Sequence, residues 1–407
     1  MNGNYLRNRN RYSSKQFNRK TKFSFPRLVT YFTRLVFGSV DREAAAFLEE
    51  LSGDGSLAKV GSGTIAKARK KLKPAVFREL LHKAVGFVYS TSSDLECPGD
   101  TRILATDGSR VTLPDTPEIR GHFDPKAGGE GTEGAPQARV SICFDVLNGI
   151  VIDALIKPLA WGERRMATKH LRFLGEGDLL LLDRGYAGIA FFKRIRKTGA
   201  NILARVKLRH SREVIAFVAS GRKDATIRLT SNEGSIALRA IRIELTSGIT
   251  EVLLTSLTDR SYDPEFFAKI YRLRWGVESQ YHFLKAPLQL ANFSGKSILA
   301  VKQDFYAHVF ASSLAAMLVL PVHAQIAGLT ADCKHTYQLG WTDAFSVVRR
   351  KLATLLLGGL EASRGCLDEI LDHLRLPRCR HACRYDRIFP RLKKLRTVRF
   401  PMNQKTV

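Results

Sequence analysis

The chain has 407 residues, of which 44% are hydrophobic and 25% are charged, the composition of a folded globular protein rather than a disordered one. Its length predicts about two to three domains. The formal net charge of +27 favours a polyanionic partner, nucleic acid first and an anionic membrane surface second. The six cysteines are too scattered for a disulfide scaffold, so we expect a cytoplasmic, nucleoid-associated protein. Residues 305–331 lack charge, but their polar residues predict a buried helix and no membrane span.

The N-terminal 96 residues are predicted to form two basic segments. Residues 1–40 contain nine Lys or Arg and no acid, which predicts a basic flexible arm. From residue 41 to 96 the apolar spacing predicts short helices, the first capped by Asp41 and ended by Gly53. The basic block between these helices favours a DNA-binding region of the helix-turn-helix type, and a solvated basic helix is the alternative. Its candidate DNA contacts are Lys67, Arg69, Lys70 and Lys71.

A mixed α/β region is predicted from residue 97 to 320. Residues 102–106 and 179–182 read as short buried strands, and residues 138–157 as two strands joined at Asn148 and Gly149. Alternating residues between 201 and 257 predict a β-rich insertion at about 204–260. A basic helical region, residues 321–407, is expected to follow, because residues 375–407 hold eleven basic residues and one acid.

Three acidic residues are the candidates for chemistry. Asp107 and Asp183 each follow an apolar strand, and ligands bind at the carboxyl ends of strands in open α/β sheets. The third, Glu278, lies on a helix predicted to run from the cap Asp263 to Pro287. On that helix one stripe contains Tyr271, Arg274, Glu278 and Lys285.

A cluster of three carboxylates needs a cation, and hard divalent ions prefer oxygen ligands. We therefore expect Asp107, Asp183 and Glu278 to bind Mg²⁺, with Mn²⁺ as a substitute. Two such ions ~3.5–4 Å apart would activate a hydroxyl and stabilise the leaving oxygen of a phosphodiester. Arg274 and Lys285 would then hold phosphates. Alternatively, the aspartates only form turns and Glu278 only pairs with Arg274.

Four segments carry a family resemblance: TDGS at 106–109, LDRGY at 182–186, LLTSLTD at 253–259 and YRLRWGVESQYHFLK at 271–285. They resemble the DDE transposases of bacterial insertion sequences, in particular insertion sequence family four. The signature of that family is Tyr, two residues, Arg, three residues, Glu, six residues and Lys. It is matched in full by Tyr271, Arg274, Glu278 and Lys285. The likeness covers most of the chain from about 60 to 305.

The resemblance implies an RNase H-like catalytic core with Asp107, Asp183 and Glu278 as the metal-binding triad, a β-rich insertion, and helical N- and C-terminal regions. It also implies cut-and-paste transposition: cleavage of double-stranded DNA at the terminal inverted repeats and joining of the 3′-hydroxyl to target DNA. A homodimer holding two DNA ends in a synaptic complex is expected from the same resemblance. The alternatives are a DNA-binding descendant without cleavage and an RNase H-fold nuclease without strand transfer.

Other features are given lesser roles. Asp145 and Asp153 flank the predicted hairpin, and strand alternation can point them at solvent. Glu163, in the segment WGERR, has no assigned role. Cys379, His381 and Cys383 have the wrong spacing for a zinc knuckle.

Overall fold

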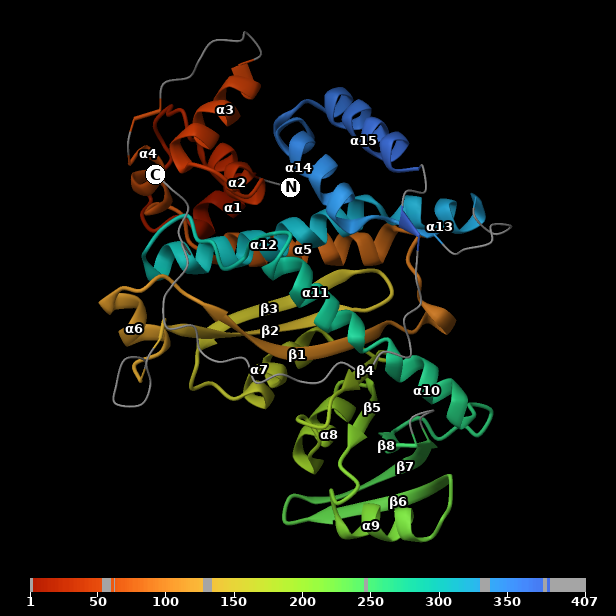
Figure 1. The fold of residues 1–407 in the computed structure, drawn as a ribbon. Coiled ribbons are helices and arrows are strands. Elements are labelled where there is room, and N and C mark those ends of the chain that lie inside the picture. The colour runs from red at the N-terminus through yellow and green to blue at the C-terminus, as the bar shows by residue number, and fades with distance from the viewer. Residues whose placement is uncertain are drawn as a thin grey trace.

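The computed structural model describes residues 3–52, 60–61, 63–126, 134–244, 248–329, 337–375 and 379–380. Their main feature is an eight-stranded sheet with the order β3-β2-β1-β4-β5-β8-β7-β6 (Figure 1). The strands are β1 (Ile103–Thr112), β2 (Gln137–Asp145), β3 (Ile150–Pro158), β4 (Leu179–Leu182), β5 (Asn201–Val206), β6 (Asp224–Ser231), β7 (Gly234–Glu244) and β8 (Thr250–Thr255). A two-stranded pair, β9 (Tyr337–Gln338) and β10 (Cys379–Arg380), lies apart from this sheet.

The first five strands form the core of the sheet. Strands β1, β4 and β5 run parallel, whereas β2 is antiparallel to β1 and β3 is antiparallel to β2. All four leucines of β4 are buried, as expected for a central strand covered on both faces. On one face lie α5 (Ala75–Thr91) and α12 (Ile298–Leu318), and on the other lie α7 (Glu163–His170) and α8 (Ile189–Arg196) (Figure 1).

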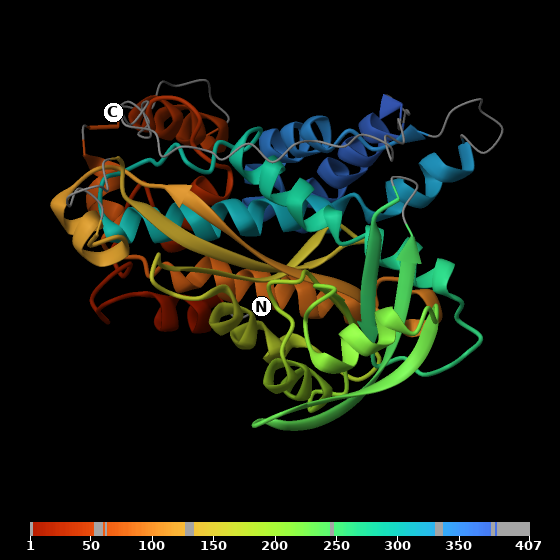
Figure 2. The ribbon, with the colours of Figure 1, turned by 60° about the horizontal axis from the view of Figure 1, so that its bottom comes forward.

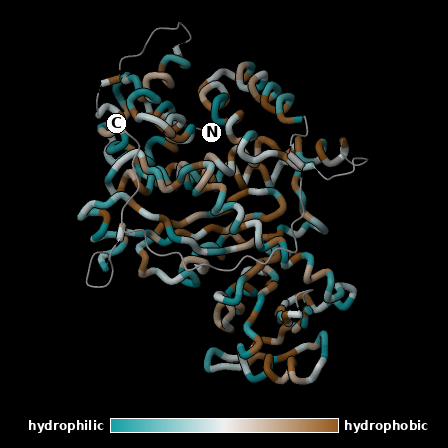
Figure 3. The backbone as a smooth tube through the Cα atoms, viewed as in Figure 1, coloured by the Kyte–Doolittle hydropathy of each residue, from teal (hydrophilic) through white to brown (hydrophobic). Residues whose placement is uncertain are grey.

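A further layer of helices covers α5 and α12 (Figure 1). In Figure 3 the outer helices alternate between apolar and polar residues, because only one face of each packs on the core. Within the described residues this layer and its neighbours are α1 (Gly3–Asn10), α2 (Phe25–Thr33), α3 (Val40–Ser52), α4 (Thr64–Arg69), α13 (Leu320–Leu329), α14 (Trp341–Leu357) and α15 (Leu360–Leu374). A short helix, α6 (Pro117–Phe123), lies beside β2 and β3.

The prediction of a flexible arm over residues 1–40 is corrected for the part that the structure describes. Helix α2 contains Phe25, Leu28, Tyr31 and Phe32, which are all buried, and it packs on α12 and α14. These apolar side chains are worth roughly 1.5–3 kcal/mol each when buried, which outweighs the repulsion among the surrounding cations. The basic charge of this segment therefore lies on a folded part of the protein.

The predicted β-rich insertion extends the core sheet instead of forming a separate one. Strand β8 pairs antiparallel with β5, and β7 and β6 follow outward from it. Helix α9 (Arg212–Ala219) packs on β6 and β7. Figure 2 shows these strands far from the N-terminal helices α2 and α3. The insertion begins after β5, so the predicted boundary at 204 falls inside a core strand.

The helix predicted from Asp263 to Pro287 is two helices. Asp263 does cap α10 (Pro264–Arg272), but α11 (Trp275–Lys285) starts anew after Arg274. Around the junction the backbone N–H groups of Leu273, Arg274 and Gly276 bond to carbonyls three residues earlier, which tightens the helix. The signature residues therefore do not form the single stripe that a straight helix predicts.

Two further expectations can be compared with the fold. Asp145 and Asp153, expected to face solvent, are both buried, because α5 covers the hairpin of β2 and β3. None of the helices in the described ranges is long and apolar enough to span a membrane. His381 and Cys383 lie outside the described residues.

Candidate active site

Asp107 and Asp183 lie at matching positions on adjacent parallel strands. Strand β1 pairs with β4 in the register Ala105 to Leu181, and continuing this register by two residues sets Asp107 opposite Asp183. Neighbouring strands are about 4.8 Å apart, so the two carboxylates leave the sheet side by side. The backbone itself thus fixes the spacing of the first two predicted acidic residues.

Asp107 is a buried acid with little local support. Its Oδ1 accepts a hydrogen bond of 2.8 Å from the backbone N–H of Gly108. Burial raises the pKa of Asp107 to about 6, and the charges of Glu278 and Glu163 raise it further, against the opposing effects of that hydrogen bond and Arg274. This carboxylate would gain from a cation nearby.

Asp183 is held by cationic neighbours. Its Oδ1 accepts hydrogen bonds from the backbone N–H of Arg184 and from Nη2 of Arg205, the latter at 3.2 Å. Burial acts to raise the pKa of Asp183, but these two contacts and the charge of Arg274 hold it below its usual value. Arg205 itself bridges to Glu251 on β8 at 2.6 Å. The second acid is therefore ionised at neutral pH.

The two helices of the signature are bonded to the strands that bear the aspartates. At the end of α10, the hydroxyl of Tyr271 donates to the carbonyl of Leu182, the residue before Asp183, at 3.3 Å. On α11, the hydroxyl of Tyr281 donates to the carbonyl of Asp107 at 2.8 Å. Lys285 Nζ donates to Ser109 Oγ at 2.6 Å. These bonds connect α10 and α11 to the site.

Glu278 and Arg274 form an ion pair, 3.0 Å from Nη2 to Oε1. The Arg274 side chain is almost completely buried, and its charge acts on Asp107 and Asp183 as well as on Glu278. Arg274 therefore lies among the three predicted acids. The structure brings Asp107, Asp183 and Glu278 to one region, with this guanidinium as their shared counter-charge.

The donor chemistry of this region fits a divalent metal ion. All three acids offer carboxylate oxygens, which Mg²⁺ and Mn²⁺ prefer. Two buried polar atoms of the region, Tyr186 Oη and Arg274 Nε, have no hydrogen-bond partner within the described residues. In the same part of the chain no three His, Cys, Asp or Glu side chains are grouped closely enough to hold a metal ion. The ion pair with Arg274 accounts for this in the case of Glu278.

Sequence reasoning missed two residues of this region, Glu163 and Tyr186. A Cβ added to Gly108 would lie 2.6 Å from Cγ of Glu163, so this side chain covers the backbone next to Asp107. Tyr186, from the segment LDRGY, is 1% exposed, and Asp107, Glu163 and Asp183 all raise the pKa of its hydroxyl beyond the effect of burial. A glycine inside a predicted strand was the available signal, because it indicates a close approach.

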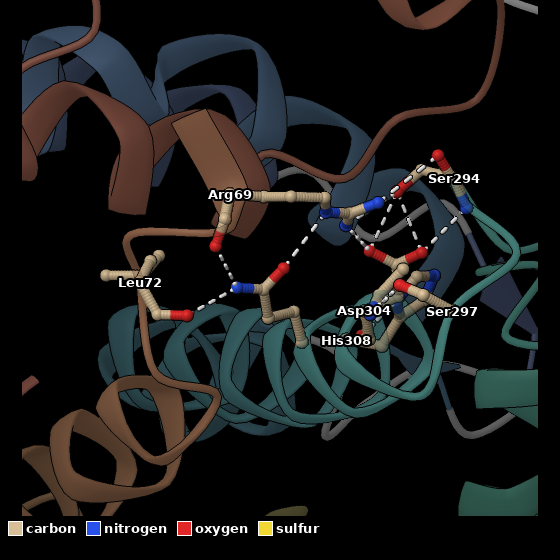
Figure 4. A network of polar contacts seen from close by, with 8 residues as sticks. Arg69, Leu72, Ser294, Ser297, Asp304 and His308 are labelled. Atoms are coloured by element: carbon tan, nitrogen blue, oxygen red, sulfur yellow. Dashed lines mark hydrogen bonds and ion pairs between the residues drawn. The ribbon is translucent and has the colours of Figure 1, made fainter. Parts of the chain in front are cut away.

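Arg69, predicted to contact DNA, is instead a buried structural residue (Figure 4). It is 5% exposed, and its Nη2 lies 2.8 Å from Oδ1 of Asp304 on α12. The Arg69 guanidinium also donates to Gln303 and to Ser294. Burial of this charge is possible only because every side of it is paired. Arg69 therefore connects α4 to the core.

The other predicted DNA contacts have mixed surroundings. Lys67, Lys70 and Lys71 are exposed and keep that prediction. Tyr271 is buried with its hydroxyl on Leu182, so a positioning role replaces the predicted DNA contact. Arg274 and Lys285 bond to protein groups at the site, and their contact with phosphate stays a prediction.

A basic groove lies next to the site, between α7 and α8. It has a volume of about 420 Å³, and exposed Arg164, Arg165, Lys169 and Arg194 line it. Arg164 Nε donates to the carbonyl of Gly185 at 2.8 Å, two residues after Asp183. The groove thus joins a cluster of positive charge to the carboxylates.

Comparison with known proteins agrees with this arrangement. A sequence-family model described as the transposase DDE domain matches residues 98–314, more than half of the chain and a range that contains all three acids. The chain belongs to the DDE transposases. Along 361 residues it is 23% identical to the transposase InsG for insertion sequence element IS4 of Escherichia coli (strain K12), covering 84% of this chain and 78% of that one. The predicted membership of insertion sequence family four is confirmed.

Among solved structures, this DDE transposase is similar to the piggyBac transposase in a synaptic complex with hairpin DNA. The TM-score is 0.44 and the sequence identity is 9%, over 89% of this chain and 79% of the other.

Proposed function

We propose that this DDE transposase catalyses cut-and-paste transposition: hydrolysis of a phosphodiester at each end of its element, followed by attack of the freed 3′-hydroxyl on target DNA. The observation that carries the proposal is the register of Asp107 and Asp183 on adjacent parallel strands, with Glu278 brought to them by α11. The order of the first five strands, with β2 antiparallel to the parallel set, supports an RNase H-like core.

Each residue of the site has a role in this proposal. Asp107, Asp183 and Glu278 hold the divalent metal ions, which would activate the attacking hydroxyl and stabilise the leaving oxygen when bound. Arg274 offsets the repulsion among the three acids and releases Glu278 when another cation is present. Tyr271 and Tyr281 fix α10 and α11 against the strands.

The basic groove between α7 and α8 is proposed to receive the DNA backbone next to the cleaved bond. Arg164, Arg165, Lys169 and Arg194 offer four positive charges within this groove, close to Asp183. Arginine forks match the geometry of phosphate oxygens. Lys67, Lys70 and Lys71 supply a second phosphate contact, and two copies of the chain would hold two DNA ends together.

The test is a cleavage assay on DNA carrying the ends that flank this gene, in Mg²⁺ and in EDTA. Wild-type protein is expected to cut at the ends only in Mg²⁺ and to join the 3′-hydroxyl to a second DNA. Asp183→Asn should bind the ends normally and cut at least about 1,000-fold more slowly, since general losses of catalytic electrostatics are of this size. Asp94→Asn, an exposed residue outside the site, is the matched control.

The outcomes separate the three possible activities. Cleavage without joining would assign the chain to the nucleases. Tight binding of the ends without cleavage would assign it to the inactive DNA-binding descendants. Equal cleavage by Asp183→Asn and wild type would contradict the triad.

A further inference from the structure

Glu163 is an acidic side chain at the site that the three-acid description leaves unexplained. It is the first residue of α7 and packs directly on Gly108 in β1. A methyl group at Gly108 would lie 2.6 Å from Cγ, 3.0 Å from Cδ and 3.2 Å from Oε1 of Glu163. Because Gly108 follows Asp107, the Glu163 carboxylate stands at the same end of the strand pair as Asp107 and Asp183.

Glu163 is oriented by a single arginine. Arg139 on β2 donates from Nη1 to Oε1 of Glu163 at 2.6 Å, and from Nε to the carbonyl of Leu159 at 3.3 Å. The second carboxylate oxygen, Oε2, accepts no hydrogen bond from the described residues, and the side chain is 43% exposed. The arginine therefore fixes the direction of the carboxylate and leaves one oxygen available.

Tyr186 gives a second, independent indication of a ligand. Its side chain is 1% exposed, and its hydroxyl has no hydrogen-bond partner within the described residues. Asp107, Glu163 and Asp183 are the acids whose charges act on this hydroxyl. An unpaired buried hydroxyl costs about 1–3 kcal/mol, so a partner bound among these acids would stabilise the protein.

A purely structural ion pair explains this arrangement poorly. Glycine inside a strand costs roughly 0.5–1 kcal/mol relative to alanine, and a surface pair between Glu163 and Arg139 returns no more than that. The close approach does, however, place a fourth carboxylate beside Asp107.

We propose that Glu163 is a fourth acidic residue of the active site, which holds a divalent metal ion, or water bound to it, together with Asp107 and Asp183. Tyr186 donates its hydroxyl hydrogen to an oxygen of the same bound group. This inference rests on the proposed function, since it assigns a further ligand to the same site.

Binding of Mn²⁺ to the full-length protein tests the proposal without reference to catalysis. Mn²⁺ is titrated into wild type and Glu163→Gln, and bound ion is measured by electron paramagnetic resonance. We expect Glu163→Gln to bind Mn²⁺ 10–100-fold more weakly, as roughly expected when a metal site loses a ligand or supporting group. Gly108→Ala should weaken binding in the same direction, because it displaces Glu163.

The matched control is Glu118→Gln. Glu118 is an exposed acid in the first turn of α6, as Glu163 is in α7, but it lies outside the carboxylate cluster. Its Mn²⁺ affinity should equal that of wild type. Thermal unfolding in EDTA and binding of end DNA show for each variant that the protein is folded.

Three results would overturn the inference. Wild-type Mn²⁺ affinity in Glu163→Gln contradicts it directly and leaves the three-acid site intact. An equal loss of thermal stability in Glu163→Gln and Arg139→Gln, with unchanged Mn²⁺ binding, would make the pair purely structural. Absence of Mn²⁺ binding in folded wild type would overturn the proposed function together with the inference.

Discussion

Asp107 and Asp183 occupy the same register of neighbouring strands, yet their pKa values shift in opposite directions. Burial raises the pKa of Asp107 to about 6, whereas hydrogen bonds from Arg184 and Arg205 lower that of Asp183 in spite of burial. The difference follows from their neighbours, since cationic side chains contact only the second carboxylate directly. Asp107 is therefore the acid whose ionised form the protein alone supports least.

Replacing Asp107 should stabilise the metal-free protein. The native state retains the proton of Asp107 to higher pH than the unfolded state, so the unfolding free energy of wild type falls between about pH 4 and 6 and is level above. Asp107→Asn lacks this fall, and at pH 7 in EDTA we expect it to be more stable by about 1–2 kcal/mol. Denaturant unfolding of both proteins at pH 4 and pH 7 measures the difference.

The same variant should lose the stabilisation that Mg²⁺ gives to wild type. A lower stability of Asp107→Asn at pH 7 in EDTA would show that the buried carboxylate is better supported than its neighbours indicate.

At the scale of elements, the attachment of α4 to α12 depends on Arg69, next to residues predicted to bind DNA. Arg69→Gln leaves Asp304 buried without its cation, so we expect a loss of about 3–5 kcal/mol in unfolding free energy. Lys70→Gln, at the adjacent exposed position, should leave stability unchanged and lower the slope of DNA affinity against salt by about one. Urea unfolding and fluorescence anisotropy distinguish the two variants. Similar effects on stability would contradict the burial of Arg69.

The attachment of α5 to the sheet depends on a buried acid, Asp153 on β3. It contacts Arg78 and His82 of α5 and His170 of α7, each at 2.8 Å. Burial acts to raise its pKa, but the hydrogen bonds from His170, His82 and Arg78 hold that pKa far below the usual range.

This depressed pKa predicts a pH dependence of stability. The stabilisation is present above the unfolded-state pKa of about 4 and is lost as the pH falls further. Asp153→Asn should cost about 3–5 kcal/mol at pH 7 and should flatten the loss below pH 4. Chemical unfolding as a function of pH measures both effects, with the exposed Asp94→Asn as control.

These elements also show how far the sequence could be interpreted. The strands at 103–112 and 179–182 and the acids that follow could be predicted, because apolar runs and their ends are local patterns. The burial of Arg69 could not, since its partner Asp304 is distant in sequence and charge alone predicts exposure. Glu163 was missed for the same reason: its contact with Gly108 joins two separate elements. The division between α10 and α11 depends on packing of Gly276 against Phe144 and Val146.

For the whole molecule, the net charge of +27 predicts how DNA binding responds to salt. The affinity for end DNA should fall by roughly 0.9 log units per log unit of salt for each phosphate neutralised. Reversing the groove charge with Arg165→Glu and Arg194→Glu should lower that slope, whereas the same change at exposed Arg222 should affect it less. Fluorescence anisotropy over a range of NaCl concentrations measures the slopes. A flat response would contradict an electrostatic interface.

The continuity of the sheet across the insertion limits how the chain could be shortened. Strand β5 carries Arg205, which supports Asp183, and its outer side pairs with β8. Deleting the insertion would leave β5 with a row of unpaired backbone groups, and such open edges promote association between chains. A truncated protein is thus expected to aggregate before its chemistry can be assayed. A compact engineered version would need a replacement edge strand, not merely a shorter loop.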